Sequence, residues 1–87
     1  AIKRDGAKAP LLDSRALVYF RQGNLSAALG DYDAALKLEP RQAWSLYMRG
    51  LIETTRGQAE AGAADKAAAL AIQPDIADDV ASYGIKS

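Results

Sequence analysis

The sequence contains no histidine and no cysteine among its 87 residues. Their absence removes the usual general base near neutral pH, the thiolate nucleophile and the commonest zinc ligands. No glycine-rich phosphate loop and no convergent set of polar residues takes their place. We therefore expect no enzymatic activity and no cofactor. The lack of cysteine leaves the compartment open, because such a chain suits the cytoplasm and the periplasm alike.

Concentrated charge and long apolar runs are also missing. Eleven Lys and Arg residues balance eleven Asp and Glu residues, and the basic residues form no stripe along the chain. Nucleic-acid and anionic-membrane surfaces need concentrated positive charge, so we expect neither partner. No apolar run approaches the roughly 20 residues that span a membrane, so membrane insertion is not expected. The first residues show no signal-peptide pattern.

The residue types that are abundant favour helices. Hydrophobic residues make up 49% of the chain, alanine is frequent, and β-branched residues are few. This composition suits one small packed helical domain better than a sheet or a disordered segment. A chain of this size buries about two-thirds of its unfolded surface, so its stability is expected to be modest.

Apolar residues recur at three- and four-residue spacing in the first half of the chain, as is typical of amphipathic helices. A first helix is expected from about Pro10 to Gln22, because proline is tolerated in a first turn and Gly23 ends the pattern. Asn24 is a good N-cap for a second helix, and Pro40 stops that helix by keeping the residue before it out of the helical conformation.

The second half repeats this arrangement. Residues 42–56 are expected to form an apolar third helix closed by Gly57, and residues 58–72 an alanine-rich fourth helix antiparallel to it. Gly62 costs about 1 kcal/mol relative to alanine, so it indicates a close approach of a neighbouring helix. Gly62→Ala is expected to be neutral if one methyl group fits there. Asp75 can cap a short fifth helix that ends near Gly84, with an apolar stripe of Ile76, Val80 and Tyr83.

The two halves are related by a fixed offset of 34 residues. The residue pairs at this distance are Gly23 and Gly57, Ala35 and Ala69, Leu36 and Leu70, and Pro40 and Pro74 (57 − 23, 69 − 35, 70 − 36 and 74 − 40). Self-similarity at a fixed period is the signature of stacked supersecondary units. We therefore expect a repeat fold and not a single irregular bundle.

The period and the residues that carry it resemble the tetratricopeptide repeat. Counted from Ala9, the first unit departs from the family pattern only at Arg15. Counted from Ala43, the second unit is degenerate, with departures at Arg49, Glu53 and Lys66. The matching residues are Leu12, Ala16, Tyr19, Ala28, Tyr32, Ala35 and Pro40 in the first unit, Leu46, Gly50, Gly62, Ala69 and Pro74 in the second, and Val80, Tyr83 and Gly84 after it.

The resemblance implies an all-α fold of antiparallel helix-turn-helix repeats, stacked as a short right-handed superhelical solenoid. It divides the chain into the tail of a preceding repeat at 1–8, repeat 1 at 9–42, the degenerate repeat 2 at 43–74 and a C-terminal capping helix at 75–85. Because Ala1-Ile2 falls in phase with the repeats, the chain is expected to be the C-terminal fragment of a longer protein.

In this family the first helix of each repeat lines a concave groove that binds proteins or peptides. Apolar and aromatic residues in one phase occupy that face here, and we expect them to contact a partner. The six candidates are Leu17, Phe20, Trp44, Tyr47, Met48 and Leu51. The alternative is that a neighbouring helix or repeat covers them. The family's peptide-carboxylate clamp is absent, because its Lys, Arg and Asn positions hold Asp13, Leu17, Tyr47 and Leu51.

We therefore predict a non-catalytic module that binds a protein or peptide partner, with self-association into a homo-oligomer as the alternative. Two other interpretations concern carboxylates. Asp31 with Asp33, or Glu53 with Glu60, could be acid–base pairs, but solvated helix faces account for these residues without any chemistry. Helix-start electrostatics likewise account for a cluster that could hold a cation, namely Asp75, Asp78 and Asp79.

Overall fold

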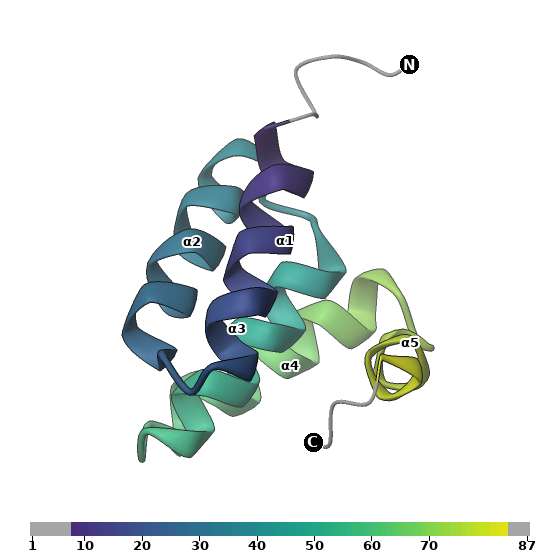
Figure 1. The fold of residues 1–87 in the computed structure, drawn as a ribbon. Helices are drawn as coiled ribbons and strands as arrows, with labels where there is room; N and C mark the ends of the chain where they lie inside the picture. The colour runs from purple at the N-terminus through teal and green to yellow at the C-terminus, as the bar shows by residue number, and fades with distance from the viewer. Residues whose placement is uncertain (1–7, 84–87) are drawn as a thin grey trace. The chain divides into compact units, whose positions relative to one another are not determined.

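The structure, a computed structural model, describes residues 8–83, and every regular element in that range is an α-helix (Figure 1). Its helices are α1 (Lys8–Arg21), α2 (Leu25–Leu38), α3 (Ala43–Thr55), α4 (Ala59–Ile72) and α5 (Ile76–Ser82). The expected all-α repeat fold is confirmed. The expected tail of a preceding repeat, 1–8, lies outside the described residues except for Lys8, which begins α1. The expected helix end at Gly84 lies outside them too.

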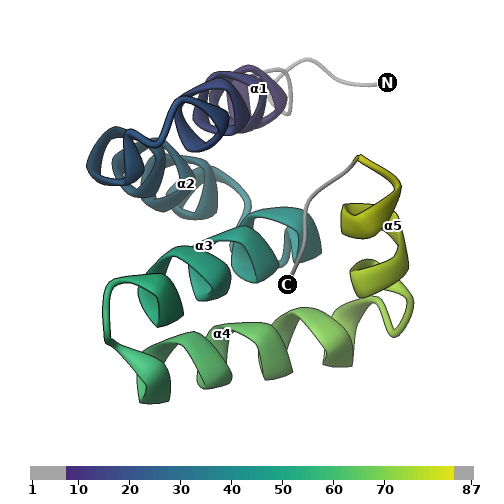
Figure 2. The ribbon, with the colours of Figure 1, turned by 60° about the horizontal axis from the view of Figure 1, so that its bottom comes forward.

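The chain divides into two compact units. The first unit, Ala1–Pro40, contains α1 packed on α2. The second unit, Arg41–Ser87, contains α3 packed on α4, with α5 in contact with both. Within each unit the two long helices run side by side in opposite directions, as Figure 2 shows for α3 and α4. Each pair is therefore a helix-turn-helix.

The turn inside each unit has the same backbone geometry. Gly23 and Gly57 adopt positive φ angles of 80° and 87°, the left-handed region that glycine enters without steric cost. The amide of Asn24 donates to the carbonyl of Tyr19 at 2.9 Å, and the amide of Gln58 donates to the carbonyl of Glu53 at 2.7 Å. Each turn is a Schellman motif, which satisfies carbonyls left open at the end of the first helix.

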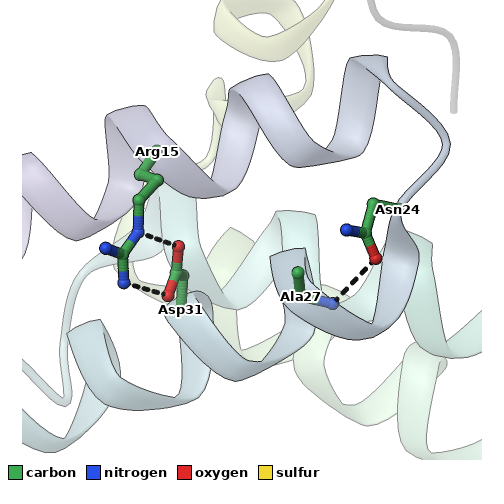
Figure 3. Close-up of polar contacts among 4 residues, drawn as sticks. All are labelled: Arg15, Asn24, Ala27 and Asp31. Carbon is green, nitrogen blue, oxygen red and sulfur yellow. Dashed lines mark hydrogen bonds and ion pairs between the residues drawn. The ribbon is translucent and has the colours of Figure 1, made fainter.

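The helix starts are less uniform than the helix ends. Asn24 caps α2 as expected, since its side-chain oxygen accepts from the backbone amide of Ala27 at 3.4 Å (Figure 3). Asp75 occupies the N-cap position of α5, but its side chain makes no capping hydrogen bond. The expected capping role of the Asp75 side chain is therefore wrong. Gln58, the counterpart of Asn24, makes no such bond at the start of α4 either.

Small residues form the contact between α1 and α2 and between α3 and α4. Ala16 in α1 and Ala28 in α2 are fully buried. In the second unit, a Cβ added to Gly62 would lie 2.7 Å from the backbone oxygen of Gly50 and would also collide with Oγ1 of Thr54. The sequence correctly indicated a close approach at Gly62. The condition for a neutral Gly62→Ala, that one methyl group fits, is not met, because the contact involves backbone atoms that cannot move aside.

The fifth helix fixes its position with two side chains. Ile76 and Val80 are almost completely buried, and α5 contacts α3 as well as α4. Asp78 and Asp79 are exposed in its first turn, where the helix dipole favours negative charge. Tyr83 follows the last residue of α5, and we describe its contact with α3 below.

Candidate partner-binding face

The six candidate residues lie on the first helix of each unit, and they differ in exposure. Leu17 and Phe20 lie on α1 and are partly exposed, as is Trp44 at the start of α3. The other three residues of α3 are buried, with exposed fractions of 5% for Tyr47, 0% for Met48 and 6% for Leu51. In the second unit, Trp44 is therefore the only one of these side chains that still offers substantial surface to another molecule.

Trp44 has an aromatic neighbour from the same unit. The ring centroids of Trp44 and Tyr83 are 4.9 Å apart, and their planes meet at 65°, which is an edge-to-face arrangement. This geometry is favourable because the positive edge of one ring meets the negative face of the other. Tyr83 itself remains 56% exposed. The C-terminal end of α5 thus partly covers the candidate face at Trp44.

The buried part of the face is supported from α4. Nζ of Lys66 lies 6.0 Å from the centroid of the Tyr47 ring, at the outer limit of a cation–π contact. Lys66 stands where the first unit has Tyr32, so the family's usual aromatic residue is replaced by a side chain whose aliphatic stem can cover apolar surface.

Each unit also carries an arginine–aspartate pair that joins its two long helices. In the first, Arg15 of α1 donates to both carboxylate oxygens of Asp31 in α2, from Nε at 2.8 Å and from Nη2 at 2.9 Å (Figure 3). In the second, Arg49 donates to Asp65 in the same way, at 2.7 and 2.9 Å. Bidentate pairs of this kind fix the orientation of both side chains, so they hold the register of each helix pair.

The family comparison agrees with the helix-turn-helix fold. A family model described as a TPR repeat, that is, a tetratricopeptide repeat, matches residues 16–52. This match supports a TPR protein. The match runs from α1 through all of α2 to Ile52 in α3. No curated protein and no solved structure matched the chain.

The TPR match indicates the general class of function. TPR repeats form protein–protein interaction modules, and as a family they are non-catalytic scaffolds. The partner and the contact residues do not follow from the family alone, because function resides in the surface that each fold carries. The exposed side chains of this chain therefore determine its partner.

The arginine–aspartate pairs were missed by the sequence analysis. Arg15 and Arg49 were noted only as departures from the TPR pattern. The available signal was their recurrence: each arginine precedes an aspartate by 16 residues, the spacing that places two residues opposite each other on adjacent antiparallel helices. Asp31, considered above as half of an acid–base pair, instead belongs to one of these ion pairs.

The electrostatics of the two pairs differ with their exposure. The side chain of Arg15 is 61% exposed, whereas that of Arg49 is only 26% exposed. Hydrogen bonding to Asp31 and the charge of Asp31 raise the pKa of Arg15 above its ordinary value. Burial favours a higher pKa for Asp65, but hydrogen bonding with Arg49 and Glu53 and the charge of Arg49 outweigh it. The pKa of Asp65 therefore lies below its ordinary value.

Within residues 8–83 no group of three or more histidine, cysteine, aspartate or glutamate residues is placed to hold a metal ion. Asp79 accepts a hydrogen bond from the side chain of Gln73, which ties the start of α5 to the end of α4. None of the helices in that part of the chain has the length and apolar character needed to cross a membrane.

Proposed function

We propose that this TPR protein binds a partner protein or peptide through the face of α3 at Trp44. The observation that carries the proposal is a partly exposed tryptophan above a fully buried apolar layer. Met48 has no exposed surface, and Tyr47 and Leu51 have almost none. The buried layer fixes the backbone of α3, so little backbone entropy remains to be lost on binding. Aromatic residues in such a setting are the usual energetic centres of interfaces.

The chemistry of the partner follows from what the face contains. The positions of the family's carboxylate clamp hold Asp13 and Leu17 in the first repeat and Tyr47 and Leu51 in the second. None of these four side chains is a cation, so the clamp positions themselves supply no counter-charge for the C-terminal carboxylate of a peptide. We infer recognition by apolar contact, with Leu17 and Phe20 as the corresponding candidates on α1.

Trp44→Ala is the direct test of this function. The full chain is used to capture partners from a cell extract, and each captured partner is then titrated against purified wild type and variant. Truncating an interface aromatic typically costs about 2 kcal/mol or more, a loss of affinity on the order of thirtyfold. Val18→Ala is the matched control, because Val18 is exposed but is not one of the candidate residues. Equal affinity of Trp44→Ala and wild type would contradict the proposal.

Self-association is the second outcome that the experiment must detect. Size-exclusion chromatography over a range of protein concentrations separates it from binding of a different protein. A dimer that dissociates in Trp44→Ala would assign the same face to a second copy of the chain. A monomer at all concentrations, together with capture of a foreign partner, supports the proposed function.

A further inference from the structure

We propose that Tyr83 is an intramolecular lid on the partner site, and that the partner replaces it at Trp44 with an aromatic side chain of its own. The inference rests on the proposed function and names what the partner must present. Its basis is the edge-to-face contact of Tyr83 with Trp44, at 4.9 Å between ring centroids. The Tyr83 ring shows that an aromatic ring fits beside Trp44.

The position of Tyr83 at the end of α5 makes it the part of that helix easiest to displace. Ile76 and Val80 are each 1% exposed and anchor α5, whereas Tyr83 is 56% exposed. The backbone amide of Tyr83 donates to the carbonyls of Val80 and Ala81, at the end of a helix of only seven residues. End turns of helices open more readily than their interiors. Tyr83 can therefore leave Trp44 while Ile76 and Val80 stay in place.

A lid of this kind lowers the apparent affinity for any partner. A partner can bind only the fraction of molecules in which Trp44 is uncovered, and the apparent dissociation constant rises in inverse proportion to that fraction. If the closed form holds about nine-tenths of the population, removing the Tyr83 ring strengthens binding on the order of tenfold. Removal of the Tyr83 ring also leaves space beside Trp44, which the ring of a free tyrosine derivative can occupy.

The test uses N-acetyl-L-tyrosinamide as the probe and the full chain as the protein. Trp44 is the only tryptophan, so its indole N–H resonance reports the site without ambiguity. In Tyr83→Ala we expect the probe to shift this resonance at a concentration on the order of tenfold lower than in wild type. Tyr83→Phe retains the ring and should behave as wild type. N-acetyl-L-alaninamide should shift nothing in any of the three proteins.

Acrylamide quenching of Trp44 fluorescence gives a second, ligand-free measurement. Tyr83→Ala should emit at longer wavelength and be quenched more readily than wild type or Tyr83→Phe. The methyl resonances of Ile76 and Val80 should stay where they are in wild type. Unchanged quenching, an equal response of wild type and Tyr83→Ala to the probe, or release of the whole of α5 in Tyr83→Ala would each overturn the lid.

The lid and the proposed function can be disproved independently of each other. They need no natural partner, whereas the Trp44→Ala titration does. If the probe binds as expected while Trp44→Ala leaves partner affinity unchanged, the lid stands as a property of α5 and the proposed function fails. If Trp44→Ala abolishes partner binding while Tyr83→Ala leaves it unchanged, the face is correct and the lid is wrong.

Discussion

The two helix pairs of this protein have the same turns and the same ion pair but differ where their helices touch. In repeat 1 both contact positions are alanines, Ala16 and Ala28. In repeat 2 the equivalent positions are Gly50 and Gly62, and a Cβ on either would lie 2.7 Å from the backbone oxygen of the other. The second pair therefore brings backbone against backbone at a distance that alanine does not permit.

This difference shows how the second unit packs without the aromatic residues of the TPR pattern. Repeat 1 has Tyr19 and the fully buried Tyr32, where repeat 2 has Glu53 and Lys66. Loss of two aromatic rings removes much apolar contact area. Closer approach of α3 and α4 recovers part of it through dispersion contacts between backbone atoms. A repeat that is degenerate by its sequence pattern is thus tightly packed by another route.

The largest expected effect comes from filling the glycine contact. Gly62→Leu should destabilise the second unit by about 3 kcal/mol or more, because overpacking costs about 1–3 kcal/mol and here the obstacle is backbone. Ala28→Leu, the matched change in repeat 1, should cost about 1–3 kcal/mol. Urea denaturation followed by circular dichroism measures both. An equal loss of stability in the two variants would contradict the conclusion that the glycine contact is tighter than the alanine contact.

Adding or removing a single methyl group at these contact positions also distinguishes the two helix pairs. Gly62→Ala should lower stability by about 1–3 kcal/mol despite the better helix propensity of alanine. The reciprocal change, Ala28→Gly, should cost roughly 1 kcal/mol in helix propensity and about 0.8 kcal/mol more for the buried methyl group that it removes. Thermal melting reports both variants. A Gly62→Ala protein that melts at or above the temperature of wild type would place α3 and α4 farther apart than described.

The ion pairs give a smaller difference. Asp65→Ala removes the bidentate carboxylate from the partly buried Arg49, and the loss of a charge-assisted hydrogen-bonded pair should cost about 1–3 kcal/mol. Asp31→Ala should cost less, because the side chain of Arg15 is 61% exposed and water can solvate it. The midpoint of urea denaturation measures both. A greater loss in Asp31→Ala would show that exposure does not rank these pairs.

Low pH should reduce the stability of the folded protein by protonating Asp65. Because the folded state lowers the pKa of Asp65 below its ordinary value of 3.8, the unfolded state takes up a proton first as the pH falls. The stability that Asp65 contributes is therefore complete above about pH 4 and is lost as the pH falls toward the folded-state pKa. Asp65→Asn should flatten this part of the stability curve between pH 5 and 2, measured by urea denaturation at each pH. An unchanged acid slope would contradict the assignment.

The smallest effect is expected at the helix starts. Asn24→Ala should cost about 0.5–1 kcal/mol, at the low end of N-cap effects, because the hydrogen bond to Ala27 is long at 3.4 Å. Gln58→Ala should be nearly neutral, since Gln58 makes no capping bond. Gln58→Asn should then stabilise α4 by a few tenths of a kcal/mol or more. Melting temperatures compare the three variants, and a destabilised Gln58→Asn would contradict the idea that the repeats have interchangeable caps.

The sequence alone was sufficient for the fold because the fold depends on local signals. Apolar spacing, Gly23, Gly57 and the two prolines fix where each helix begins and ends, and these residues act on their own backbone or that of their near neighbours. Recurrence at 34 residues then identified the family. The six residues of the candidate face followed from helical phase, which assigns residues to a face but leaves their exposure undetermined.

Tertiary structure decided what the helical phase left open. Burial of Tyr47, Met48 and Leu51, and the contact of Tyr83 with Trp44, depend on which helix packs against α3. The same holds for the missing space at Gly62 and for the pairing of Arg15 with Asp31 and of Arg49 with Asp65. Each is a contact between residues on different helices. Local propensity determines the helices, but the distance between two helix backbones is set by the side chains that both of them place in the interface.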